Sequence, residues 1–316
     1  SYVGNGSVRC TSLAFSAADG SVYVAGWATG IATLPNTAGA IQPTHANAGN
    51  AAMTDTFVAR LSADLRTLHK ATFFGGAADV EQINAVAVHP HTGLVYIVGL
   101  TNSTALPGSA VGTQTAFNGA TDAFIARLPA DLLGAANVRY TFIGGISTDI
   151  GYSLAIDAGS GDVFVAGTSY GGLPSSMVVG AAQTAHAGGG DAFVARLKPD
   201  LSMVRATYLG GNDEDRATSL ALDPLTGDVV IAGFTRSTAP NALPQSAGGA
   251  QSAYGGGLAD GFAARLAGDL TAIRQTTYLG GSGWDCETFS CVVAVHPQSG
   301  EVFVAGATDN VGLPPA

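Results

Sequence analysis

The sequence contains few charged residues and no long apolar run. Asp, Glu, Lys and Arg make up 11% of the 316 residues, against about 25% in an average soluble domain. Every uninterrupted apolar stretch falls short of the roughly 20 residues that a transmembrane helix needs. We therefore expect no membrane insertion.

Positive charge is also scarce. Lys and Arg number 13 against 23 Asp and Glu, which gives a formal net charge of -10. A surface of this sign repels phosphate backbones and anionic lipid headgroups. The composition therefore argues against nucleic acid or a membrane surface as the partner.

Cysteine is rare, and the three residues have no metal-binding spacing. Cys10, Cys286 and Cys291 are an odd number and lack a second Cys or His pair at a zinc-like spacing, so they match no metal motif and cannot all pair within the chain. One disulfide and one free thiol are expected if the protein is exported. A bridge from Cys10 to Cys286 or Cys291 would join the first and last repeats, and a local Cys286–Cys291 bridge is equally compatible. The chain opens at Ser1 without Met or a signal-like segment, which is typical of a mature or trimmed product.

Two strong signatures recur along the chain. Asp-x-Phe-x-Ala-Arg-Leu returns every 67 to 69 residues, and each copy is followed by Thr, an aromatic residue, one apolar residue and Gly-Gly. The first signature begins at Asp55, Asp122, Asp191 and Asp260. The second begins at Thr72, Thr141, Thr207 and Thr277.

Two weaker signatures complete the repeat. One is a short apolar run ending at a turn, and the other resembles Val22-Tyr-Val-Ala-Gly26, which is echoed from Val302. The turns between them close on Gly93, Gly161, Gly227 and Gly300, where we expect positive φ. Each repeat thus predicts four short strands joined by hairpins and apolar on both faces, which is typical of sheets stacked between neighbours.

The expected fold is an all-β propeller in a single domain over residues 1–316. Complete units cover about 5–76, 77–145, 146–211 and 212–281, and residues 282–316 with 1–4 form a fifth blade split between the termini. Closing the ring in this way protects sheet edges. The fifth blade is short of a strand, so it has three strands, or another chain supplies the fourth, or these residues belong to a longer protein.

The four signatures together resemble the SBBP-type β-propeller repeats of exported bacterial proteins. The resemblance covers essentially the whole chain, although the repeat of about 68 residues is longer than the roughly 40 to 50 of familiar propellers. It implies a propeller fold and a secreted, extracellular or cell-surface location, with the periplasm as an alternative. It implies no catalytic motif.

Four long loops, at residues 27–54, 100–121, 168–190 and 234–259, lie at one end of the predicted blades, where binding residues usually gather. Each loop carries a Gln followed three residues later by a ring, and such pairs could form sugar-binding platforms. Packing within each repeat is the favoured alternative, because a residue present in every unit usually serves the unit. The candidates are His45, Phe117, His186 and Tyr254, with Gln114, Gln183 and Gln251.

Acidic residues gather in the links that follow Gly-Gly. Asp79, Asp149, Asp213 and Asp215 are the candidates for a metal site, and Ca²⁺ is the cation that converging carboxylates suit. Their spacing matches no calcium loop, so solvated surface charge is the favoured interpretation. The Asp that opens each first signature is expected to accept hydrogen bonds from loop N–H groups.

These patterns predict an exported, non-catalytic binding or assembly module with no identified catalytic residue. Its partner would be a protein or a glycan at the long-loop face, and the incomplete fifth blade offers a route to self-assembly, for example in a surface filament. A lectin-like propeller is the first alternative. A propeller lyase or hydrolase is the second.

Overall fold

The computed structural model describes residues 6–77, 80–286 and 291–309. The described chain is all-β apart from two single 3₁₀ turns, Ala135–Asn137 and Ser175–Met177, and none of its helices is long or apolar enough to cross a membrane. The chain forms two compact units, Ser1–Asp162 with Lys198–Ser202, and Val163–Leu197 with Met203–Ala316.

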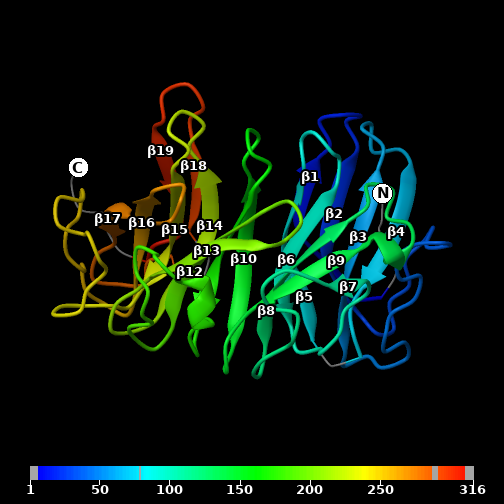
Figure 1. Cartoon of the computed structure of the whole chain (residues 1–316), viewed down its shortest axis with the longest axis horizontal. Helices are drawn as coiled ribbons and strands as arrows, with labels where there is room; N and C mark the ends of the chain where they lie inside the picture. Colours follow the sequence, from blue (N-terminus) through cyan, green and yellow to red (C-terminus); the bar gives the residue numbers. More distant parts are fainter. Residues whose placement is uncertain (1–5, 78–79, 287–290, 310–316) are drawn as a thin grey trace. The chain divides into compact units, whose positions relative to one another are not determined.

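The first unit contains two antiparallel sheets with strands in chain order (Figure 1). One sheet is four-stranded and consists of β1 (Val8–Phe15), β2 (Val22–Thr29), β3 (Thr54–Leu61) and β4 (Leu68–Phe74). The other consists of β5 (Glu81–Val88), β6 (Val95–Thr101), β8 (Asp122–Leu128) and β9 (Arg139–Ile143), with β7 (Ser109–Ala110) added parallel to β9. Strand β10 (Asp149–Ile156) packs against this second sheet.

The second unit repeats the same order and ends on a smaller sheet. Its first strands are β11 (Val163–Ser169), β12 (Asp191–Leu197) and β13 (Met203–Leu209). A four-stranded antiparallel sheet follows with β14 (Asp215–Leu222), β15 (Val229–Thr235), β16 (Asp260–Leu266) and β17 (Ile273–Leu279). The last sheet has two strands, β18 (Val292–Val295) and β19 (Val302–Ala305).

The sequence signatures fall on successive strands of each sheet. The run ending at a turn is the first strand, the Val-Tyr-Val-Ala-Gly type is the second, Asp-x-Phe-x-Ala-Arg-Leu is the third, and the strand before Gly-Gly is the fourth. The predicted hairpin turns are confirmed, since Gly93, Gly161, Gly227 and Gly300 have φ between 70° and 76°. Ser1–Gly4, expected to complete the last blade, lie outside the described residues.

The third strands are buried on both faces, as stacking between sheets requires. Strand β8 has one partly exposed residue in seven, Arg127, and Phe124 on it stacks against Phe74 of the neighbouring sheet at a ring separation of 5.9 Å. The chain is therefore an all-β protein with several four-stranded antiparallel sheets, an arrangement consistent with a β-propeller.

A glycine in each second strand is required by close backbone approach. A Cβ on Gly26, Gly99 or Gly233 would lie within 1.8 Å of a carbonyl oxygen on the bulged first strand. The same glycine pairs with the phenylalanine of the third strand. The repeat therefore fixes both the bulge and the register of the next strand.

Candidate functional site

A fully buried aspartate opens each third strand. One oxygen of each carboxyl accepts a backbone N–H from the long loop, which confirms the role expected from the sequence. The four pairs are Asp55 with Ala46, Asp122 with Asn118, Asp191 with Ala187, and Asp260 with Gly255, at 2.6 to 2.9 Å.

The recurring loop glutamine ties this aspartate to the Gly-Gly segment. In the second sheet, the Gln114 amide nitrogen donates to Asp122 at 3.0 Å, and its oxygen accepts the Gly144 N–H at 2.9 Å. Gln42, Gln183 and Gln251 make the same two contacts. The polar groups of the predicted sugar-binding amides are thus engaged within their own repeat.

The ring that follows each glutamine packs edge-on against the aromatic residue two positions before Gly-Gly. The pairs are His45 with Phe73, Phe117 with Phe142, His186 with Tyr208, and Tyr254 with Tyr278, at 5.6 to 6.1 Å between ring centres. These contacts are those expected of loop packing. A role for the rings in sugar binding stays a prediction.

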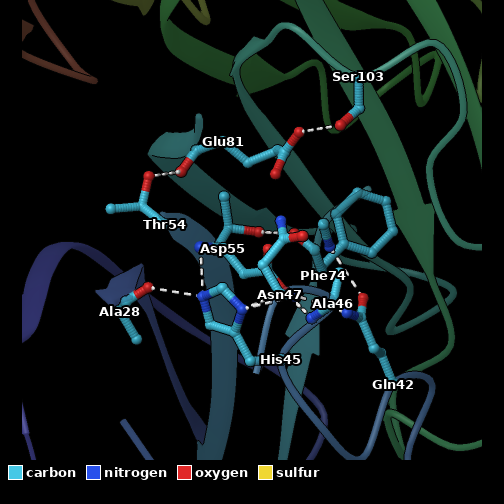
Figure 2. Close-up of polar contacts among 12 residues, drawn as sticks. Ala28, Gln42, His45, Ala46, Asn47, Thr54, Asp55, Phe74, Glu81 and Ser103 are labelled. Carbon is cyan, nitrogen blue, oxygen red and sulfur yellow. Dashed lines mark hydrogen bonds and ion pairs between the residues drawn. The ribbon is translucent and has the colours of Figure 1, made fainter. Parts of the chain in front are cut away.

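Figure 2 shows the first copy of this arrangement. The Asp55 N–H donates to Nε2 of His45 at 3.0 Å, and the Nδ1 atom of the same ring lies 3.4 Å from the Asp55 carboxyl. The Glu81 carboxyl accepts hydrogen bonds from Thr101 and Ser103. His45 therefore acts as a buried link between its loop and the third strand.

A second buried acid of the same unit faces each of these aspartates. We call these carboxyls the junction pairs: Asp55 with Glu81, Asp122 with Asp149, Asp191 with Asp215, and Asp260 with Asp285. In three pairs the second acid accepts the N–H of the second glycine in Gly-Gly, from Gly145, Gly211 or Gly281, at 2.7 to 2.9 Å.

In two junction pairs both carboxyls converge on the first glycine of Gly-Gly. A Cβ on Gly144 would lie 2.6 Å from Oδ1 of Asp122 and 2.9 Å from Oδ2 of Asp149. A Cβ on Gly280 would lie 2.6 Å from Asp260 and 2.8 Å from Asp285. The first glycine is therefore required in these repeats, because any side chain there would collide with the two carboxyls.

Burial disfavours ionisation of these acids. It raises the pKa of Glu81, Asp122 and Asp215 to about 7 and that of Asp260 to about 6, and the facing carboxyl raises each pKa further. The buried oxygens Asp55 Oδ1, Asp122 Oδ1, Asp191 Oδ1 and Asp260 Oδ1 have no hydrogen-bond partner. A proton held by the pair removes the cost of two facing charges in a dry interior.

The predicted metal ligands do not form one group. Asp149 and Asp215 belong to separate junction pairs, Asp213 is exposed, and Asp79 lies outside the described residues. Across residues 6–77, 80–286 and 291–309, no cluster of three or more His, Cys, Asp or Glu is placed to hold a metal ion. Each junction pair offers two carboxyls, whereas Ca²⁺ takes six to eight oxygens.

The last sheet leaves apolar side chains uncovered. Phe303 on β19 is 59% exposed, whereas its equivalents Tyr23, Tyr96, Phe164 and Val230 are at most 3% exposed. Strand β19 pairs with β18, and no described strand pairs with its other edge. The edge of β19 is therefore open within the part of the chain that the structure describes.

A cavity of about 560 Å³ lies beside this edge, between β19 and the preceding four-stranded sheet. The residues lining it include Ala263, Leu279, Val302, Val304, Cys286 and Cys291. The two cysteines are joined in a disulfide, and Cys10 is free and exposed. The structure thus has the local bridge, one of the two alternatives left open by the sequence.

Strand β1 in the first unit also presents an uncovered face. Leu13 is 58% exposed, whereas its equivalents Val86, Leu154 and Leu220 are at most 9% exposed. Phe15 on the same strand is exposed as well.

The sequence analysis missed the junction pairs and the cavity. A signal for the pairs was present, because an acid follows the second glycine by four or five residues in every repeat. A signal for the cavity was weaker: the third strand of the fourth repeat has Gly261 and Ala263 where the others have larger residues at both positions. Neither small residue is unusual in a strand taken alone, so the sequence did not indicate the cavity.

Comparison with known proteins finds a remote structural likeness and no family. No family model matches the chain, and no curated protein matches it. Among solved structures, the chain is similar to Sqt1 from Chaetomium thermophilum, a WD40 β-propeller, at 10% identity and a TM-score of 0.25 over 85% of this chain and 71% of that one. A likeness this remote carries no argument about the fold or the function of this chain.

Proposed function

We propose that the chain is an exported, non-catalytic binding and assembly module, a five-bladed propeller of the SBBP type, and that its binding surface is the open edge of β19. The observation that carries this proposal is the exposure of Phe303 and Val302 at positions that every other sheet buries. An exposed apolar edge strand is a template for strand addition by another polypeptide.

The long loops offer less support for a binding role. Their recurring amides and rings are used in contacts within each repeat. The β19 edge, by contrast, has no partner strand among the described residues, and it combines exposed apolar side chains with an adjoining cavity. Main-chain hydrogen bonds would supply affinity there, and the cavity would supply selectivity.

The test is selection from a displayed library of extended nine-residue peptides. We expect the protein to enrich peptides that bind wild type and lose binding to the Phe303→Asp variant. Val179→Asp, at an exposed apolar residue that does not line the cavity, is the matched control and should bind as wild type does. Enrichment of no peptide, or equal binding to both variants, would overturn the proposal, and glycan-array binding would favour the lectin alternative.

A further inference from the structure

An Asn-Gly pair, Asn118 and Gly119, lies in the long loop that precedes β8. We infer that this pair is a site of spontaneous covalent modification: the Gly119 nitrogen attacks the Asn118 side chain, converts it to aspartate and isoaspartate, and so loosens the loop from its sheet. The reaction takes water as its co-reactant. It concerns a different region from the proposed binding surface and does not depend on it.

The reaction is the loss of ammonia followed by the uptake of water. The backbone nitrogen of Gly119 bonds to the side-chain carbonyl carbon of Asn118, its proton passes through solvent to the departing amide nitrogen, and ammonia leaves a cyclic succinimide. Water then adds to one of the two ring carbonyls and opens the ring. One opening gives ordinary aspartate, and the other gives isoaspartate, in which the main chain runs through the former side chain.

Both reacting groups are accessible. Asn118 and Gly119 are exposed and lie outside the strands and the 3₁₀ turns. Across residues 6–77, 80–286 and 291–309, neither the Asn118 side-chain amide nor the Gly119 N–H has a hydrogen-bond partner. The attacking nitrogen is also unobstructed, because glycine has no Cβ. The two groups are held next to each other by the chain itself, which favours an intramolecular step.

Hydrogen bonds hold the side chains of other asparagines, which are Asn36, Asn50, Asn84, Asn102 and Asn212. Asn137 and Asn241 are exposed and have no side-chain hydrogen bond among the described residues, but a residue with a Cβ follows each of them. Asn118 is the described asparagine that combines an unbonded amide with a following glycine. Asn5, which precedes Gly6, lies outside the described residues.

The modified segment holds its loop against the link that follows β9. The Ala120 N–H donates to the Ser147 carbonyl at 3.1 Å, and the Asp149 N–H donates to the Thr121 carbonyl at 2.8 Å. Gly119 lies tightly against the same link, since a Cβ there would come within 2.6 Å of the Ser147 oxygen. Isoaspartate inserts one extra main-chain carbon immediately before these contacts, so they cannot all keep their register.

These contacts support one junction pair. Asp122 accepts the Asn118 N–H at 2.9 Å, and Asp149 is tied to Thr121 through its own N–H. A shift of the loop therefore changes how the two buried acids are held. We expect isoaspartate at position 118 to lower the melting temperature.

The experiment ages the full chain in mildly alkaline buffer and follows each asparagine by peptide mass spectrometry. Fragment ions locate the mass increase of an NH₂-to-OH exchange and distinguish isoaspartate from aspartate. Asn118 should convert about tenfold faster than Asn137 and Asn241, which corresponds to a barrier lower by about 1.4 kcal/mol. These two asparagines are internal controls because they are exposed in the same way.

Two variants connect the modification to the loop. Asn118→Gln keeps an amide and the N–H that Asp122 accepts, but its longer side chain must close a larger ring, so the aged variant should melt as fresh protein does. Asn118→Asp has the new charge without the extra main-chain carbon, and it should also melt as fresh wild type does. Aged wild type should melt lower, in proportion to its isoaspartate content.

Each outcome decides the inference. Conversion of Asn118 at the rate of Asn137 and Asn241 would overturn it, and this comparison within wild type needs no variant to fold. Conversion of Asn118 with unchanged melting would overturn the loosening of the loop. Faster conversion together with lower melting in wild type alone supports both steps.

Discussion

Two equivalent residues, Phe74 in the first unit and Leu279 in the second, differ in how far the next sheet buries them. In the first unit, Phe74 before Gly-Gly is fully buried against Phe124 of the next sheet. In the second unit, Leu279 occupies the equivalent position and lines a cavity, because β18 and β19 have no described third strand beside them.

The comparison shows which strand completes the contact. The residues before the two Gly-Gly pairs are both large and apolar, so their own sequence does not decide their burial. The third strand of the following sheet does, because it brings the phenylalanine and arginine that cover the neighbouring rings. Among the described residues no third strand lies beside β19, and the equivalent piece of core is therefore uncovered there.

The largest expected effect on stability is the loss of the aromatic contact between Phe124 and Phe74 in the first unit. Phe124→Ala should lower the free energy of unfolding by about 3–5 kcal/mol, since it leaves a cavity in a packed core. Leu279→Ala should cost about 1 kcal/mol, because its side chain already borders empty space. Urea denaturation followed by fluorescence measures both, and equal losses would contradict the comparison.

The next effect concerns the space between the acids of a junction pair. Gly144→Ala should lower the free energy of unfolding by about 2 kcal/mol, because the new Cβ meets two buried carboxyls. Gly159→Ala is the control: its Cβ comes no closer than 3.7 Å to Asp157, so the change should stay within about 0.5 kcal/mol. If Gly144→Ala leaves the free energy of unfolding unchanged, the two carboxyls can move aside for the new Cβ at no energetic cost.

The disulfide beside the β19 edge should contribute a similar amount to the free energy of unfolding. Cys286→Ser with Cys291→Ser should lower the free energy of unfolding by about 2 kcal/mol, the chain-entropy value for a loop this short, and should weaken peptide binding at the cavity. In the unreduced wild type, a maleimide reagent should modify Cys10 alone. Labelling at two or three cysteines in the folded protein would contradict the bridge.

The smallest expected effect is the pH dependence of the junction pairs. The folded-state pKa of Asp122, about 7, exceeds the unfolded value near 4, so its contribution is fully present below about pH 4 and is lost as pH rises to about 7. Stability should therefore fall over this range, and Asp122→Asn should flatten the fall and leave the protein more stable than wild type at pH 8.

Asp200→Asn gives the contrasting control. Hydrogen bonds from Ser202 lower the pKa of the exposed Asp200 carboxyl, so its stabilisation is present above the unfolded pKa and is lost as pH falls. This variant should change stability only on the acid side, as measured by urea denaturation at pH 3, 5 and 8. An Asp122→Asn profile parallel to wild type would mean that the pair carries no proton at neutral pH.

The sequence by itself determined the strands, their order and their turns. Local signals suffice for these features, because a glycine with positive φ closes each hairpin and a Phe-Gly pairing fixes each register. It also predicted correctly that the aspartate of each third strand accepts loop N–H groups.

The tertiary structure alone decided which repeated residues meet and which stay uncovered. Asp122 and Asp149 lie 27 positions apart on different sheets, and their proximity depends on how the sheets stack. The same holds for Phe303, whose exposure reflects the strand beside it and not its own signature. Burial is a property of neighbours distant in the chain, so a local pattern specifies the strand but not what covers it.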